Sequence, residues 1–272
     1  MSEDYTPRRI VSLQPSATLI LRDLGKLDLV IGCTKYCAEA CPEVVERGIP
    51  IIADSWTAQS QQIRELKPDF VIASVPYQEK SVIEILKANV PLLALAPKRL
   101  ADIYSDIAVI ARITNAAIEG ERVICRMQEE IKVVSERTRN LPKPRVFCEE
   151  WPKPLIASQR WVAELVEAAG GEFVGTSGVQ TSFEQIAAAD PEIIIAAWCG
   201  ARDRVPLDKI VSGRGWEHVQ AIKQGRVYSI RDEYLNTPAP TLLCGLRALA
   251  SAIHPEQFPQ AEGLRCIQKI IG

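Results

Sequence analysis

Short apolar runs alternate with amphipathic stretches along most of the chain, and glycine, proline or asparagine residues separate many of them. The runs have the length of buried strands, and between them apolar residues recur at the three- and four-residue spacing of helices. This alternation is typical of βαβ units, in which helices cover the faces of a parallel sheet. The predicted strands are 9–13, 29–34, 49–52, 69–74 and 91–95 in the first half, and 145–149, 192–198 and 227–230 in the second.

Helices are predicted between these strands from their periodicity and from the residues at their ends. Pro15 and Ser16 open the first helix, with Ser16 as its N-cap, and Gly25 ends it. The other predicted helices in the two halves are 61–66, 80–89, 161–169, 183–189 and 241–253.

Residues 100–140 follow a different pattern, because helical periodicity continues there without an intervening strand. Helices in globular domains usually run about 8–20 residues. We therefore expect one helix that packs on a first lobe, followed by a rigid connector to a second lobe, with the boundary at Leu141-Pro142-Lys143-Pro144. The predicted domains are a first α/β lobe at 8–114, a connecting helix at 115–141 and a second α/β lobe at 145–272.

One phrase occurs in both halves of the chain: a short helix, a proline beside an acidic residue, and a buried strand. It reads Leu-Lys-Pro-Asp-Phe-Val-Ile-Ala at 66–73 and Ala-Asp-Pro-Glu-Ile-Ile-Ile-Ala at 189–196. The repetition predicts an internal duplication of one lobe.

Composition agrees with two globular lobes and narrows the range of partners. The chain has 272 residues, of which 47% are hydrophobic and 24% are charged, a balance that lets each lobe bury a core. The formal net charge is -2, with both signs interspersed. Because no basic stripe is present for a phosphate backbone, we expect no nucleic-acid partner.

The N-terminal sequence lacks the basic region, apolar stretch and cleavage site of a secretory signal. No window approaches the ~18 uninterrupted apolar residues typical of a membrane span. We therefore expect a cytoplasmic protein without membrane insertion, whereas a chain trimmed of its signal would be periplasmic. In the cytoplasm the eight cysteines would be thiols, which favours metal or redox chemistry over a disulfide framework.

The segment Arg-Ile-Val-Ser-Leu-Gln-Pro-Ser-Ala-Thr at 9–18, the phrase Lys-Pro-Asp-Phe-Val-Ile at 67–72 and the long connector resemble one family of substrate-binding proteins. Its members have a rigid helical backbone and serve ABC importers of cobalamin, iron-siderophores, heme, and zinc or manganese. The resemblance extends from about residue 8 to residue 253. It implies an α/β fold of two Rossmann-like lobes joined by a single long helix, with the ligand in a cleft between the lobes.

Within that family the chain most resembles the cobalamin-binding branch. Exported members have a tyrosine just after the second strand and a tryptophan before the short helix, and Tyr36 and Trp56 occupy these ligand-lining positions. Ser74 and Leu155 stand where exported members have other aromatic residues. The resemblance thus implies that the cargo is a corrinoid or a related metal chelate. A small organic or siderophore ligand without cobalt is the alternative.

Exported members also carry an acidic residue on each lobe that docks onto arginines of the membrane permease. Glu184 supplies this residue on the second lobe, but the first-lobe position is Gln61, which cannot form an ion pair. We therefore do not expect ordinary docking to a permease. The segments 148–156, 160–162 and 197–201 resemble a cytosolic subgroup of the family instead.

Glu150 and Cys199 stand just beyond the carboxyl ends of predicted strands, where α/β sheets bind ligands. Cys37 follows the second strand and would face the same cleft. These three residues form a candidate ligand set for zinc, iron or the cobalt of a corrinoid, although ordinary partly buried cysteines explain them equally. Trp151 and Trp198 are suited to stack on a flat macrocycle, with core packing as the alternative.

The sequence contains no nucleophile elbow, phosphate-binding loop or metalloprotease motif. We therefore expect non-catalytic binding with no required cofactor, and cobalamin or a transition metal as the possible bound species. The alternative is a cytosolic metal-binding protein, or an enzyme with Cys37 or Cys199 as nucleophile or metal ligand and Glu150 as general base.

Overall fold

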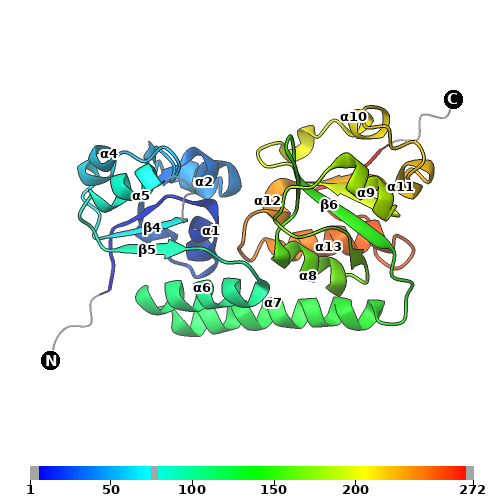
Figure 1. The fold of residues 1–272 in the computed structure, drawn as a ribbon. Coiled ribbons are helices and arrows are strands. Elements are labelled where there is room, and N and C mark those ends of the chain that lie inside the picture. The colour runs from blue at the N-terminus through cyan, green and yellow to red at the C-terminus, as the bar shows by residue number, and fades with distance from the viewer. Residues whose placement is uncertain (1–5, 75–78, 268–272) are drawn as a thin grey trace. The chain divides into compact units, whose positions relative to one another are not determined.

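The computed structural model describes residues 6–74 and 79–267. The chain divides into two compact units. The first comprises the chain up to Pro97 together with Ala101–Arg126, and the second comprises Lys98–Leu100 and the chain from Met127 onward. Each unit is an α/β sandwich built around its own sheet (Figure 1). The predicted α/β class with two lobes is confirmed.

The first unit contains a fully parallel five-stranded sheet in the order β3-β2-β1-β4-β5. Its core is formed by apolar residues of β1 and β4 together with α4 and α5, including Val11, Ile63, Val71 and Ile85. The strands are β1 (Ile10–Ser12), β2 (Val30–Thr34), β3 (Ile51–Ile52), β4 (Phe70–Ser74) and β5 (Leu92–Leu95). The helices are α1 (Pro15–Asp23), the 3-10 helix η1 (Leu27–Leu29), α2 (Lys35–Ala40), α3 (Glu43–Glu46), α4 (Ser60–Glu65) and α5 (Glu79–Leu86).

The second unit contains a six-stranded sheet in the order β11-β10-β9-β6-β7, with β8 paired to β6. The strands β8, β6, β9 and β10 are parallel, and β7 and β11 are antiparallel to their neighbours. The strands are β6 (Arg145–Pro152), β7 (Leu155–Ala157), β8 (Glu172–Phe173), β9 (Ile193–Ala196), β10 (Val227–Ile230) and β11 (Leu264–Cys266). The helices are α8 (Arg160–Ala168), α9 (Phe183–Ala189), the 3-10 helix η2 (Arg202–Arg204), α10 (Leu207–Ser212), α11 (Gln220–Lys223), α12 (Asp232–Leu235) and α13 (Leu242–Ile253).

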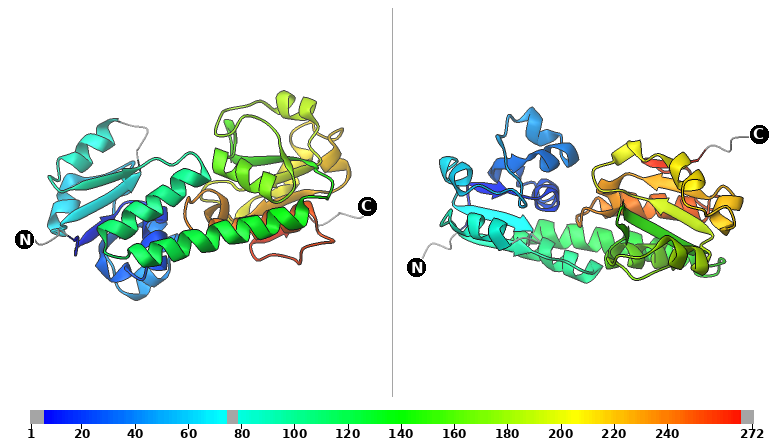
Figure 2. Two further views of the ribbon diagram at one scale, coloured as in Figure 1. Left: turned by 90° about the horizontal axis from the view of Figure 1, so that it is seen from below. Right: turned by 45° about the horizontal axis from the view of Figure 1, so that its top comes forward.

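The long helical stretch consists of two helices, α6 (Leu100–Ile113) and α7 (Ala117–Thr138). The chain turns between them at Asn115, whose φ of 52° ends helical geometry. Gly120 of α7 permits close approach of α6, because a Cβ there would lie 2.5 Å from the Cβ of Ala111. The division between the two units falls within α7, which is one continuous helix in both views of Figure 2.

The repeated phrase makes the same contacts in both units. In the first unit, the backbone N–H groups of Arg8 and Arg9 donate to the Asp69 carboxylate, and the Arg9 guanidinium donates to the carbonyl of Lys67. In the second unit, the Arg145 N–H donates to the Glu192 carboxylate, and its guanidinium donates to the carbonyl of Asp190.

Lys67 and Asp190, the residues before the two prolines, both have left-handed φ values, of 49° and 45°. In both units the helix ends at a left-handed residue, the strand begins just after the proline, and an arginine guanidinium binds the carbonyl of the residue before the proline. This similarity supports the predicted duplication.

Two local predictions are wrong. Ser16 is not the N-cap of α1, because Gln14 holds that position and Pro15 occupies the first helical turn, where its missing N–H costs nothing. The second strand was expected to be followed by a loop that carries Cys37 and Cys41, but the chain forms the short helix α2 there, whose N-cap Thr34 accepts a hydrogen bond from the Cys37 N–H. The short strands β7, β8 and β11 were not predicted.

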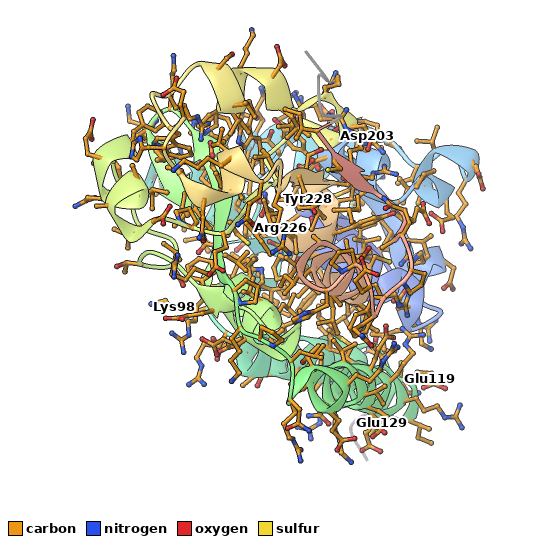
Figure 3. The ribbon with its side chains drawn as sticks, turned by 90° about the vertical axis from the view of Figure 1, so that its right-hand side faces the viewer. Lys98, Glu119, Glu129, Asp203, Arg226 and Tyr228 are labelled. Carbon is orange, nitrogen blue, oxygen red and sulfur yellow. The ribbon has the colours of Figure 1, made fainter. Side chains whose placement is uncertain are left out.

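None of the helices described between residues 6 and 267 is both long enough and apolar enough to span a lipid bilayer. The longest, α7, is amphipathic and carries acidic residues such as Glu119 and Glu129, which project from its surface in Figure 3.

A buried ion pair lies in the core of the second unit. Glu149 of β6 is fully buried and accepts two hydrogen bonds from the guanidinium of Arg214, at 2.6 and 2.8 Å. The Arg214 side chain is 6% exposed and lies over the rings of Phe183 and Trp216. Burial raises the pKa of Glu149, and Arg214 opposes that rise. The two charges therefore depend on each other inside a largely apolar core.

We predict that Arg214→Met destabilises the second unit by about 3–5 kcal/mol, because it leaves the Glu149 carboxylate buried without its partner. Urea unfolding followed by tryptophan fluorescence measures this, since Trp216 lies beside Arg214. Arg247→Met is the matched control, because Arg247 pairs with Glu130 at the surface and its loss costs about 0–1 kcal/mol. Equal effects of the two substitutions would contradict the prediction.

We also predict a pH-dependent penalty at Asp106 of α6. Burial, with the negative charge of Asp102, raises the pKa of Asp106 from 3.8 to about 6. The folded chain thus holds this proton more tightly than the unfolded chain, so stability falls as pH rises from about 4 to about 6. Asp106→Asn removes the penalty and stabilises the protein by about 1 kcal/mol at pH 7 after allowance for solvent screening. The substitution should leave the free energy of unfolding unchanged below pH 3.8, where Asp106 is protonated in the folded and the unfolded chain. Urea titrations at pH 7 and below pH 3.8 measure the two free energies.

Candidate functional site

The residues predicted to bind ligand lie at or after the carboxyl ends of strands, but Glu150, which was expected just beyond its strand, lies within β6 because that strand continues to Pro152. In the first unit, Tyr36 lies in α2 directly after β2, and Trp56 lies four residues after β3. In the second unit, Trp151 lies near the end of β6, and Trp198 and Cys199 follow β9. This is the edge at which α/β sheets bind ligands.

Exposed aromatic side chains are confined to this edge. Across residues 6–74 and 79–267, the exposed aromatic residues are Tyr36, Trp56 and Trp151, at 38%, 42% and 41% of their full surface. The Lys35 ammonium lies 4.7 Å from the centre of the Tyr36 ring, and the Trp151 indole N–H donates to the Lys153 carbonyl at 2.8 Å. All three rings are therefore partly open to solvent, and these contacts anchor the rings of Tyr36 and Trp151.

Trp198 differs from these three aromatic residues. It is half-buried and packs against the apolar core of the second unit, whose members include Phe147 and Ala196. Core packing, the alternative weighed from the sequence, thus accounts for much of this side chain.

Glu150 and Cys199 lie close together in the second unit. The Cys199 thiol lies 3.9 Å from Oε1 of Glu150, and the Cys199 N–H donates to the Glu150 carbonyl at 3.1 Å. Two residues that the sequence did not single out complete the cluster. Gln159 donates from Nε2 to Oε2 of Glu150 at 2.8 Å, and Asn236 donates from Nδ2 to the Cys199 sulfur at 3.3 Å.

The electrostatics of this cluster disfavour ionisation of the Cys199 thiol. Although Cys199 as a whole residue is exposed, desolvation of its sulfur raises the pKa of the thiol to about 12, and the charges of Glu150 and Asp232 add to the rise. Burial also raises the pKa of Glu150, against the effect of its hydrogen bonds from Gln159 and Cys199. A thiol in this state is a hydrogen-bonding group at neutral pH and a poor nucleophile. It becomes a metal ligand only with the loss of its proton.

Cys37, the third member of the predicted metal set, lies in the first unit and is fully buried. Its sulfur is 3.2 Å from Oγ1 of Thr34 and 3.6 Å from the Ser12 carbonyl oxygen. Burial opposes ionisation of Cys37, but hydrogen bonds from Cys33, Thr18 and Thr34 outweigh burial and lower its pKa to about 6.

In the part of the chain that the structure describes, no group of three or more His, Cys, Asp or Glu side chains is arranged to hold a metal ion. The set of Cys37, Glu150 and Cys199 stays a prediction.

The two positions considered for permease docking lie at the surface. Glu184 lies in the first turn of α9, behind the Ser182 and Gln185 capping box. Gln61 lies in α4 and donates to Oε1 of Glu65 at 2.9 Å. These contacts describe the local structure of the two positions and leave docking as a prediction.

Comparison with known families decides the kind of protein. A family model described as periplasmic binding protein matches residues 10–234. The chain belongs to the periplasmic binding protein family. Its membership confirms the predicted family, and it confirms a binding protein rather than an enzyme, because its relatives are substrate-binding proteins.

Relatives of this periplasmic binding protein are distant in sequence. The uncharacterized ABC transporter substrate-binding lipoprotein YvrC of Bacillus subtilis is 25% identical, covering 93% of this chain and 82% of YvrC. A cobalamin-binding protein of Halobacterium salinarum is 21% identical, over 92% of this chain and 70% of the relative. A vitamin B12-binding protein of Vibrio cholerae is 22% identical, over 89% and 88%.

Solved structures share the fold. A periplasmic heme binding protein from Pseudomonas aeruginosa has a TM-score of 0.85 at 18% identity, and the match covers 98% of this chain and 100% of that protein. The periplasmic vitamin B12 binding protein BtuF of Vibrio cholerae has a TM-score of 0.73 at 20% identity, over 92% and 98%. At these identities the likeness concerns the fold alone.

We predict that Glu150→Gln lowers the pKa of Cys199 and speeds its alkylation at pH 8 about three- to tenfold, because one negative charge beside the sulfur is removed. Iodoacetamide labelling followed by peptide mass spectrometry measures the rate, with Cys125 in the same sample as the reference thiol. Glu172→Gln, which replaces an exposed carboxylate on β8, is the control. An unchanged Cys199 rate in Glu150→Gln would contradict the electrostatic account.

Proposed function

We propose that this periplasmic binding protein reversibly binds a corrinoid or a related metal chelate without catalysis, and that it resembles the substrate-binding proteins of ABC importers but acts in the cytoplasm. The observation that carries the proposal is the restriction of exposed aromatic rings, across the described residues, to Tyr36, Trp56 and Trp151. Exposing aromatic rings to water is unfavourable, because their surface is apolar. Aromatic rings are also the side chains best suited to stack on the face of a large conjugated ring. Relatives named as cobalamin- and vitamin B12-binding proteins support the same cargo.

Cys199 and Glu150 give the second unit a polar contact for this cargo. A corrinoid presents a cobalt ion with an exchangeable axial position and a rim of amide groups. The Cys199 thiol is suited to replace the axial ligand with loss of its proton, and the Glu150 carboxylate is suited to accept from an amide. Trp198 would support this edge from within the core.

The cysteines support a cytoplasmic location for this binding step. All eight are free thiols, and three of them, Cys125, Cys199 and Cys266, are exposed. Unpaired exposed thiols suit a reducing compartment. With Gln61 in place of an acidic residue, we propose a scavenging, carrier or sensing role in which ordinary permease docking is not the main contact.

The test is a titration of the reduced protein with hydroxocobalamin, followed by visible absorption and by heat. We expect saturable binding, and a shift of the cobalt bands that is lost in Cys199→Ala. Tyr36→Ala, Trp56→Ala and Trp151→Ala should each weaken binding about tenfold, which corresponds to about 1.4 kcal/mol and matches the usual contribution of one stacked ring. Testing them singly separates the contribution of each unit.

Ile118→Ala is the control for these substitutions, because Ile118 is a strongly exposed apolar residue of α7. It should leave the affinity unchanged. Saturable binding of hemin but not of hydroxocobalamin would assign a different metal chelate, and the absence of binding to both would overturn the proposed function.

A further inference from the structure

The loop that carries Cys199 is held from one side by a single carboxylate. Asp232, the first residue of α12, accepts the Gly200 N–H at Oδ2 over 2.7 Å and the Arg202 N–H at Oδ1 over 2.8 Å. Both oxygens of one side chain are therefore committed to two backbone amides of the loop. Charge-assisted hydrogen bonds of this kind are stronger than bonds between neutral groups.

One of these two amides belongs to a residue in an unfavourable backbone conformation. Gly200 has a φ of 75°, which glycine adopts freely, whereas Arg202 has a φ of 49°. A left-handed conformation costs a residue with a side chain about 1–2 kcal/mol, so Arg202 adopts it only where other contacts impose it. The Asp232 carboxylate supplies such a contact at Arg202.

Asn236 holds the same loop one helical turn later. Its Nδ2 donates to the Ala197 carbonyl at 2.6 Å and to the Cys199 sulfur at 3.3 Å. Asp232 and Asn236 are four residues apart, so the short helix α12 presents both side chains on one face. Together they contact the chain on each side of Cys199.

Helix α12 is itself fixed in place. Its Leu235 carbonyl accepts the indole N–H of the buried Trp161 at 2.8 Å. At the far end of the loop, Arg265 of β11 donates to the carbonyl of Asp203, which lies beside β11 in Figure 3. The loop is thus attached to α12 at its start and to β11 at its end.

We propose that Asp232 and Asn236 are positioning residues that hold Cys199 against Glu150 and so set the affinity of this edge for cargo. Neither residue needs to touch the cargo. The cargo part of this inference rests on the proposed function, whereas the positioning of the thiol does not.

The experiment compares Asp232→Ala and Asp232→Asn in the full chain. Both remove the charge, but Asn retains one acceptor oxygen for a loop amide. We expect Asp232→Ala to raise the alkylation rate of Cys199 at pH 8, relative to Cys125 in the same sample, about tenfold, and Asp232→Asn to raise it less. Hydroxocobalamin affinity should fall about tenfold in Asp232→Ala and about threefold in Asp232→Asn.

Asp203→Ala is the matched control, because Asp203 also carries a carboxylate on this loop. Its side chain is 58% exposed, and its ion pair with the Arg231 guanidinium is long, at 4.0 Å. Thermal melting identifies any variant that fails to fold, and Asp232→Asn then carries the comparison. Cys199 reactivity and affinity equal to those of Asp203→Ala in both Asp232 variants would overturn the positioning role. If the unmodified protein binds no hydroxocobalamin, the proposed function fails, and the difference in alkylation rate between Asp232→Ala and Asp232→Asn still decides the positioning role, because both variants remove the charge that raises the Cys199 pKa.

Discussion

The ion pair between Glu149 and Arg214 constrains the whole of the second unit's binding edge. The Glu149 side chain is committed to the interior, and the pairing of β6 with β7 shifts its register between Glu149 and Trp151, so Glu150 lies at an irregularity of the strand beside the edge. There Glu150 meets Cys199, which follows the neighbouring strand β9. A shift of β6 by one residue would bury Glu150 without an arginine and would carry Glu149 out of the core. The buried pair thus fixes the register on which the candidate site depends.

The same cluster indicates binding rather than catalysis. The Cys199 thiol, whose pKa is raised, is poorly prepared to attack a substrate. It and the Glu150 carboxyl group already take part in hydrogen bonds with each other and with Asn236 and Gln159. They are well prepared to form hydrogen bonds, and the thiol can ligate a metal that displaces its proton. Strained loop geometry at Arg202 also agrees with a binding edge, because proteins retain such strain where a side chain must be held in one position.

The sequence was sufficient for the regular parts of the fold. Buried parallel strands are continuous apolar runs, and proline and glycine mark their ends, so β4, β9 and β10 could be placed closely. The strands β7 and β11 are short, and they form because they pair with β6 and β10, not because of a strand-favouring composition. Arg214 could not be assigned to Glu149, 65 residues away, although an acidic residue inside a predicted buried strand does imply that it needs a cationic partner.

The left-handed residues at the ends of α4 and α9 also matter for protein engineering. Lys67 and Asp190 each occupy a conformation that asparagine and glycine adopt more readily. Glycine would relieve the strain but would also enlarge the conformational freedom of the unfolded chain, so its net gain is small. Asparagine relieves part of the strain without that entropic cost. Lys67 is exposed, and Arg9 bonds to its backbone carbonyl, not to its side chain. A substitution at Lys67 can therefore stabilise the scaffold without altering any cargo contact.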